Sequence, residues 1–172
     1  TASIAVNAAM TGHLVLSTLH TNNASTTLPR LIDMSVEPFL LSSTVNLIVA
    51  QRLVRKICEK CRFSKTVPSN ELPKAIPPDL IKKNFGDEKE VRIYQGKGCP
   101  VCHNTGYRER IGIFETLQVT STIRDLIEAK SSAETIHKKA VDEGMTTMLE
   151  DGLVKVKLGI TTVDEVVSAT KG

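Results

Sequence analysis

The sequence predicts an α/β fold, in which part of a parallel sheet is followed by an inserted four-cysteine subdomain and a C-terminal helical bundle. The first observation is a near-continuous apolar run at His13–Leu19, typical of a strand covered on both faces. The second is that all four cysteines occur in two C-x-x-C pairs. The third is a series of three S/T-x-x-E capping boxes late in the chain.

The composition excludes several classes of protein. The 172 residues are 41% hydrophobic and 24% charged, which is ordinary for a globular chain and excludes a disordered one. No apolar run approaches the roughly 18 residues that span a bilayer, so no transmembrane segment is predicted. No secretory signal opens the chain, so we expect a cytoplasmic protein. A net charge of +3 does not by itself indicate a nucleic-acid partner.

The first 50 residues hold three charged side chains, Arg30, Asp33 and Glu37. So few charges predict a segment that is buried or faces other protein. The chain opens inside an apolar pattern that fits a helix ending near Gly12. A lone buried strand at His13–Leu19 would lack partners for its backbone. We therefore expect a fragment of a larger sheet whose other strands lie upstream.

Residues 1–57 are expected to belong to that core. Asn22 or Asn23 is predicted to cap a helix over 24–34. Pro38 is predicted to open a helix over 39–50. The alternation of basic and apolar residues over 51–57 predicts a strand with one exposed face.

Residues 58–110 are expected to form the inserted subdomain, with a short helix around 79–84 and a strand over 91–94. Residues 111–172 are expected to give a final core strand over 111–117 and then the helical subdomain. The capping boxes that predict its helices are Ser131 with Glu134, Thr147 with Glu150, and Thr162 with Glu165.

The cysteine pairs are Cys58 with Cys61 and Cys99 with Cys102. Each pair can form a tight knuckle, and two knuckles supply the four sulfurs of a closed, structural zinc site. The alternatives are unliganded or disulfide-bonded cysteines, but disulfides are rare in the cytoplasm and a redox motif needs only one pair. The pairs are further apart than the roughly 15–20 residues of a common zinc ribbon. An inserted segment explains the longer spacing.

Two histidines flank the predicted buried strand. His13 and His20 would lie about 23 Å apart on opposite faces, at about 3.3 Å per residue, so a straight strand cannot bring them to one metal. Thr18, His20 and Thr21 would follow the carboxyl end of the strand, where open α/β sheets bind ligands. The alternative is a pair of hydrogen-bonded structural histidines. The phosphate-loop pattern G-x-x-x-x-G-K-[ST] is absent from the sequence.

The string Thr11–Asn22 resembles the His box of the secretion-superfamily traffic ATPases, in the type II secretion and type IV pilus assembly branch. Asn104 and Glu109 depart from the family, which commonly has glycine at both positions. The further stretches that follow in the family's order are Val36–Leu41, Ala50–Arg55, the paired cysteines, Thr105–Tyr107, Arg110–Glu115 and Glu143–Gly152.

The resemblance implies the C-terminal part of a RecA-like P-loop ATPase core that works as a homohexamer, with ATP and Mg²⁺ as cofactors of the full-length protein. It would lie peripherally at the inner face of the cytoplasmic membrane and act on an inner-membrane platform protein to add pilin or pseudopilin subunits. The four cysteines favour an assembly or secretion motor, because retraction motors generally lack them. The phosphate loop would precede Thr1, so the fragment alone is expected to be inactive.

The same resemblance implies the nucleotide-site residues. His20 would lie near the γ-phosphate as a catalytic residue, supported by His13 in the same box. The remaining nucleotide-binding candidates are Thr18, Thr21, Gln51 and Arg52.

Two other functions are open from the residues alone. A zinc-ribbon nucleic-acid binder is suggested by the basic run Arg52–Lys65, which has a net charge of +5. Phe63 is the single aromatic residue in that run, which is poor for stacking on bases, and no nucleic-acid partner is expected. A purely structural interaction module is the other alternative.

Overall fold

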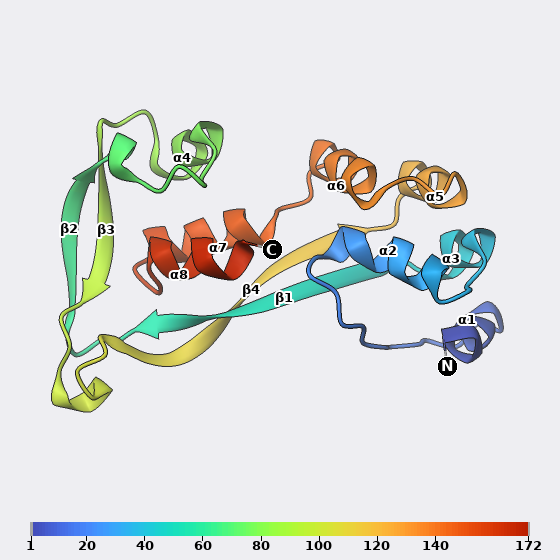
Figure 1. Cartoon of the computed structure of the whole chain (residues 1–172), viewed down its shortest axis with the longest axis horizontal. Coiled ribbons are helices and arrows are strands. Elements are labelled where there is room, and N and C mark those ends of the chain that lie inside the picture. Colours follow the sequence, from blue (N-terminus) through green and yellow to red (C-terminus); the bar gives the residue numbers. More distant parts are fainter. Residues whose placement is uncertain (1, 172) are drawn as a thin grey trace. The chain divides into compact units, whose positions relative to one another are not determined.

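The computed structural model of the protein describes residues 2–171, which form a mixed α/β structure (Figure 1). Its elements in chain order are α1 (Ala2–Met10), α2 (Ala24–Asp33), α3 (Pro38–Thr44), β1 (Leu47–Ile57), β2 (Arg62–Pro68), η1 (Ser69–Glu71), α4 (Pro78–Phe85), β3 (Glu90–Gly96), η2 (Pro100–Cys102), β4 (Tyr107–Gln118), α5 (Ser121–Glu128), α6 (Ala133–Asp142), α7 (Met148–Lys157) and α8 (Val163–Thr170).

The chain divides into two compact units. Unit 1 comprises Thr1–Ala50 and Glu115–Thr147, and unit 2 comprises Gln51–Phe114 and Met148–Gly172. Strands β1 and β4 pair with each other, and each unit contains part of both strands. This division differs from the three consecutive segments expected from the sequence, 1–57, 58–110 and 111–172. The functional assignment of those segments stays a prediction.

Unit 1 is built from amphipathic helices. Helix α3 packs on α1 and α5, and α2 packs on α6. Its core contains the fully buried side chains of Leu28, Leu41, Leu117 and Ile123. Asn23 caps α2 as predicted, because its side chain accepts the N–H of Thr26.

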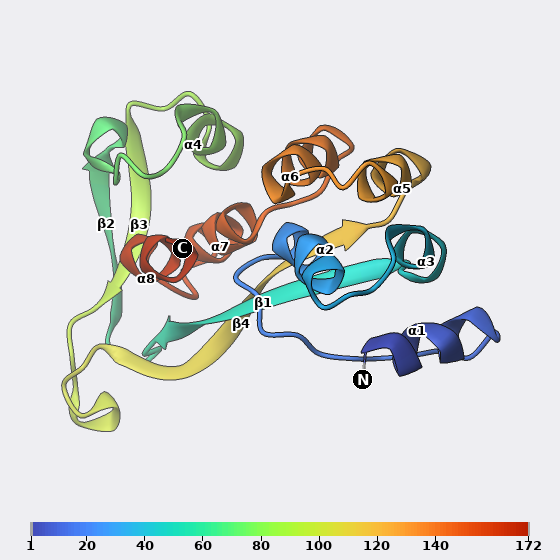
Figure 2. The same cartoon turned by 45° about the vertical axis from the view of Figure 1, so that its right-hand side comes forward.

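Unit 2 is built around an antiparallel hairpin of β2 and β3 (Figure 2). The register runs from Arg62 opposite Gly96 to Pro68 opposite Glu90. Helix α7 packs against β3, α4 and α8. The core contains Val91 from β3 together with Leu153, Val156 and Val166, which are fully buried.

The predicted buried strand at His13–Leu19 is wrong. Residues 13–20 have no regular secondary structure, and Leu14 and Leu16 are 89% and 88% exposed. Within residues 2–171 this segment joins neither sheet, so no neighbouring strand is present to accept its backbone hydrogen bonds. The described sheets are two-stranded, and the β2–β3 pair is antiparallel rather than parallel.

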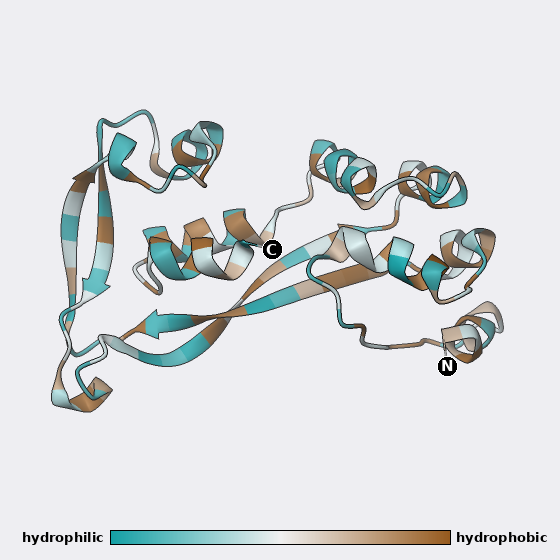
Figure 3. Cartoon of the chain, viewed as in Figure 1, coloured by the Kyte–Doolittle hydropathy of each residue, from teal (hydrophilic) through white to brown (hydrophobic). Residues whose placement is uncertain are grey.

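The predicted helix over 39–50 is too long. Helix α3 ends at Thr44, Val45 already has extended backbone angles, and β1 begins at Leu47. Figure 3 shows the apolar start of β1 in brown. Two β-branched residues, Ile48 and Val49, favour a strand there. The exposed Val49 follows the half-buried Ile48, which is the alternation of a sheet.

Three further features of the fold differ from expectation. Strand β2 was not predicted, because its residues are mostly polar and it ends at Pro68. The cap of α6 is Ser132 rather than Ser131. Among the described residues, α5 and α6 lie in unit 1 whereas α7 and α8 lie in unit 2, so the C-terminal helices are divided rather than gathered in one bundle.

Candidate metal centre

The first cysteine pair lies in the connection between β1 and β2. The N–H of Cys61 donates to the carbonyl of Cys58 at 3.2 Å and closes a tight turn. The N–H of Cys58 donates to the carbonyl of Gly106 at 3.0 Å. The residue just before β4 therefore holds this turn in place.

The second cysteine pair lies at the two ends of the short helix η2, with Cys99 just before it and Cys102 as its last residue. The N–H of Cys102 donates to the carbonyl of Cys99 at 3.1 Å, and the N–H of Asn104 donates to the same carbonyl at 2.9 Å. His103 and Asn104 have left-handed backbone angles, with φ of 49° and 61°. This conformation favours glycine, which explains why glycine suits the position of Asn104. Glu109 has a φ of 66°, so the same reason applies there.

Two glycines bring the backbone segments around the knuckles into contact. A methyl group added to Gly96 would lie 2.1 Å from the carbonyl oxygen of Gly106. A methyl group on Gly106 would lie 2.7 Å from the carbonyl oxygen of Gly96. No side chain fits at either position, because both obstacles are backbone atoms.

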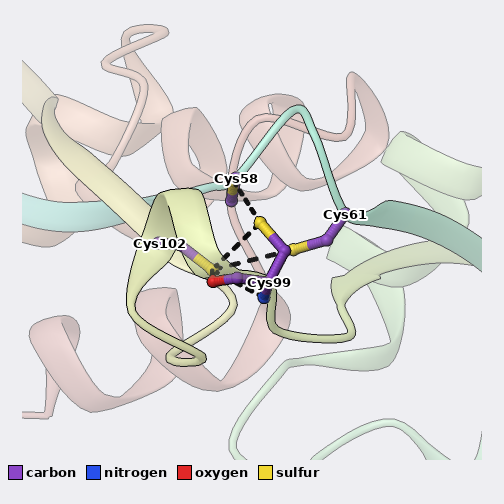
Figure 4. A group of neighbouring side chains, drawn as sticks. All are labelled: Cys58, Cys61, Cys99 and Cys102. Atoms are coloured by element: carbon purple, nitrogen blue, oxygen red, sulfur yellow. Dashed lines mark hydrogen bonds between the residues drawn. The ribbon is translucent and has the colours of Figure 1, made fainter.

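The fold brings the four cysteine sulfurs together, as predicted (Figure 4). All four Sγ atoms lie within 4.8 Å of one another. The separations are 3.9 Å for Cys58–Cys99, 3.9 Å for Cys61–Cys102 and 3.7 Å for Cys99–Cys102. A disulfide needs about 2.05 Å, so these cysteines are free thiols. Four sulfurs each about 2.3 Å from a zinc ion form a tetrahedron with edges of about 3.8 Å, so this donor set fits zinc.

Backbone N–H groups favour a thiolate within the cluster. Burial raises the pKa of the Cys102 thiol, but hydrogen bonds from the N–H groups of Cys99 and Gly106, at 3.2 and 3.3 Å, outweigh it and bring the pKa to about 6. Burial and the neighbouring sulfurs raise the pKa of Cys61 to about 11, against a hydrogen bond from Gly98. The N–H groups of Cys99 and Gly106 therefore favour the thiolate form of Cys102, which is the form that binds a metal.

Three basic side chains near the cysteine pairs have partners of their own. Lys56 forms an ion pair with Glu109 at 3.1 Å. Arg62 donates to the carbonyl of Gly159 at 3.0 Å, and Lys97 lies over the ring of Phe63 at 5.2 Å.

The candidates of the His box lie in unit 1. The Nδ1 atom of His13 lies 3.0 Å from Thr11 Oγ1 and 3.2 Å from the carbonyl of Ala8, so this ring sits at the end of α1. His20 and Thr18 are exposed. The hydroxyl of Thr21 lies 3.0 Å from that of Thr27 in α2.

Gln51 and Arg52 lie in β1, where Gln51 is exposed and Arg52 is half-buried. The Nε2 atom of Gln51 would lie 2.9 Å from a methyl group added to Gly112. The nucleotide roles of these two residues and of the His-box candidates stay predictions.

Sequence reasoning assigned no role to Glu115, which the structure places in the core of unit 1. Its carboxylate accepts the N–H of Ala24, the first residue of α2, at 2.7 Å. The sequence pattern that could have identified Glu115 is its alternation with apolar residues in the strand. Ile113 and Leu117 lie on the same side of the strand and are fully buried, so the acid between them also faces inward.

Comparison with known proteins gives a match over nearly the whole chain. Residues 1–168 match the family model described as type II/IV secretion system protein. The type IV pilus assembly ATPase PilB of Thermus thermophilus is 43% identical over 173 residues, covering 99% of this chain and 18% of that protein. The type II secretion system protein E of Pectobacterium carotovorum is 43% identical over 171 residues, covering 99% of this chain and 32% of that protein.

A solved structure gives a match in fold. The pilus retraction motor PilT, solved with bound ADP, superposes with a TM-score of 0.60 at 23% identity, covering 99% of this chain and 36% of that one. This chain thus spans less than a third of the two curated relatives and about a third of PilT. None of the helices described between residues 2 and 171 combines the length and apolarity needed to span a membrane.

Proposed function

The chain belongs to the type II/IV secretion system protein family, and we propose that it is the C-terminal part of a hexameric motor ATPase. The membership confirms the family resemblance seen in the sequence. In the full-length protein, hydrolysis of Mg²⁺-bound ATP would drive the addition of pilin or pseudopilin subunits. The observation that carries the proposal is the 43% identity, over 99% of this chain, to both a pilus assembly ATPase and a type II secretion protein.

The four-cysteine cluster is proposed to hold a structural zinc ion. The support is that three of the six sulfur separations are 3.7 to 3.9 Å, close to the edge of a zinc–sulfur tetrahedron, and that all six are within 4.8 Å. With all four positions taken by cysteine, zinc would crosslink the chain and leave no open position for substrate. The ligands would be Cys58, Cys61, Cys99 and Cys102.

We propose that unit 1 and the strands β1 and β4 correspond to part of a RecA-like core, and that the β2–β3 hairpin with its knuckles is the inserted zinc subdomain. The likeness to PilT supports the fold. The retraction motor is a relative in fold, and the cysteine cluster favours an assembly or secretion motor for this chain.

His20 is proposed to act near the terminal phosphate of ATP, and His13 is proposed to support the segment that carries it. The residues proposed to contribute to nucleotide binding are Thr18, Thr21, Gln51 and Arg52. An imidazole at that position can hydrogen-bond the terminal phosphate and couple its loss to movement of a domain. The exposure of His20 and Thr18 supports this proposal, because both side chains are accessible to a ligand.

The full-length protein is proposed to be a homohexamer bound peripherally to the cytoplasmic face of the inner membrane. There it would act on a membrane platform protein. A nucleic-acid function has little support, because Phe63 and Tyr94 on the hairpin already contact cations of the chain itself.

The test is the ATPase kinetics of the full-length protein. We expect His20→Ala to lower kcat at least about 100-fold while the nucleotide Kd changes less than about threefold, since the lost contact acts on the reacting phosphate. Ser17→Ala, at an exposed position of the same segment, is the matched control and should keep kcat. Equal losses of kcat and nucleotide affinity would make His20 a structural residue. The 172-residue chain alone is expected to turn over no ATP.

A further inference from the structure

Glu115 is a buried acid that the proposed function has not used. Its side chain comes from β4 and is 4% exposed. Its Oε1 atom accepts the backbone N–H of Ala24 at 2.7 Å, and Ala24 is itself fully buried. The two residues are 91 positions apart in the sequence, so this bond fixes one end of α2 to a distant strand.

This hydrogen bond gives the first N–H group of α2 an acceptor. The first N–H groups of a helix have no acceptor within the helix. Asn23 takes the N–H of Thr26 at 2.9 Å, which leaves the N–H of Ala24 for Glu115. A carboxylate at a helix N-terminus also interacts favourably with the helix dipole, and a hydrogen bond to a charged acceptor is stronger than a neutral one.

The preceding segment has few attachments of its own. Residues 13–20 are without regular structure, and within the described residues they join neither sheet. After them, Thr21 is bonded to Thr27 of α2 at 3.0 Å. The chain therefore enters α2 beside Thr21, and Glu115 holds the first residue of that helix.

We propose that Glu115 is a positioning residue for residues 18–23, acting through the first turn of α2 to fix where His20 stands. The effect on ATP hydrolysis rests on the proposed function of His20, whereas the effect on the segment itself does not. Glu115 itself is not proposed to contact the nucleotide.

The first test is hydrogen exchange of the backbone amides in the 172-residue chain. Glu115→Ala removes the acceptor, so the Ala24 amide should exchange at least about tenfold faster. Glu115→Gln keeps an acceptor oxygen and loses the charge, so its effect should be smaller and in the same direction. Amides of α5, such as that of Ile127, should be unchanged, because they are bonded within their own helix.

The matched control is Glu128→Gln. Glu128 accepts a hydrogen bond from Ser42 at 2.6 Å in the same unit, and that bond joins α5 to α3 rather than to α2. It should leave the exchange of Ala24 unchanged. The inference is overturned if Glu115→Gln and Glu115→Ala leave Ala24 as slow as in the wild type, or if they speed every amide of unit 1 alike.

The second test is ATPase kinetics of full-length Glu115→Gln, compared with full-length Glu128→Gln. We expect kcat to fall about tenfold or more and KM for ATP to rise by a smaller factor, because displacing residues 18–23 moves His20 together with the binding candidates Thr18 and Thr21. An equal loss of kcat in Glu115→Gln and Glu128→Gln would mean that Glu115 has only a general structural role. If the wild-type protein shows no ATPase activity, the proposed function fails, and the exchange experiment still decides whether Glu115 holds the first turn of α2.

Discussion

Arg55 and Glu165 are joined by two hydrogen bonds. The guanidinium of Arg55 donates to Oε1 of Glu165 at 2.6 Å, and the backbone N–H of Arg55 donates to Oε2 at 3.0 Å. The same guanidinium lies 4.2 Å from the ring centre of Tyr107, whose hydroxyl lies 3.1 Å from that of Thr162. The start of α8 is thereby fixed to β1 and β4 close to Cys58.

This pair predicts a pH dependence of stability. The hydrogen bond from Arg55 holds the pKa of Glu165 below its ordinary value of about 4.3, so the pair stabilises the folded chain above that pH and the stabilisation is lost as the pH falls through the folded pKa. At pH 7, Glu165→Gln should lower the free energy of unfolding by about 1 kcal/mol, a modest effect because half of the Arg55 side chain is exposed. Urea unfolding from pH 7 to pH 3 measures both.

The difference between wild type and Glu165→Gln should begin to shrink below about pH 4, where the unfolded chain binds the proton first, and should vanish below the folded pKa, where the acid is as neutral as the amide. Glu109→Gln is the control, since the partner of Glu109 is Lys56 and its side chain is 64% exposed. It should change the free energy of unfolding by less than about 0.5 kcal/mol. A difference for Glu165→Gln that stays constant down to pH 3 would contradict the assignment of the charge.

The cysteine cluster predicts one zinc ion per chain. Because binding to such a site contributes directly to folding, removal of zinc with a strong chelator should lower the melting temperature by more than about 10 °C. Cys102→Ser should do the same and reduce the zinc content measured by elemental analysis. His103→Asn, next to Cys102 and exposed, should keep the zinc and tolerate the left-handed backbone there. A metal-free chain that unfolds identically with and without chelator would exclude the zinc site.

The close backbone contact between Gly96 and Gly106 predicts that position 96, beside the cysteine knuckles, accepts only glycine. Gly96→Ala would place a methyl group 2.1 Å from the carbonyl oxygen of Gly106, so the two backbone segments must separate. We expect a loss of about 2 kcal/mol or more in the free energy of unfolding. Lys65→Ala, at an exposed position of the neighbouring strand β2, is the control and should change the free energy of unfolding by less than about 0.5 kcal/mol. Similar losses in both variants would argue against the contact.

Lys130 predicts a stabilising substitution. It follows α5 with a φ of 51°, and the bonds from Lys130 to Ile127 and from Ser131 to Leu126 form a Schellman motif. Lys130→Gly should raise the free energy of unfolding by about 1 kcal/mol, because glycine adopts this backbone conformation without a steric penalty. Lys138→Gly, at an exposed position inside α6, should lower it by about 1 kcal/mol. Chemical unfolding of both variants checks the two signs.

The features predicted from the sequence depend on residues close together in the chain. The end of α1 before Gly12, the cap of α2 at Asn23 and the closed C-x-x-C turns are each decided within about five residues. The boundary between α3 and β1 was misplaced, because the apolar residues from Val45 to Ala50 fit a buried helix as well as a strand. The segment His13–Leu19 has the composition of a buried strand. It does not form one, because a strand also needs a neighbouring strand to pair with, and composition does not determine that.

By itself, the sequence determined the family, the pairing of the cysteines and the local starts of most helices. Only the tertiary structure decided that the four sulfurs lie within 4.8 Å, that the helices after β4 are divided between two units, and that Glu115 holds the first turn of α2. The physical reason is the range of the forces involved. Caps and turns are satisfied by neighbours along the chain, whereas burial, strand pairing and a bond across 91 residues depend on which distant segments the fold brings together.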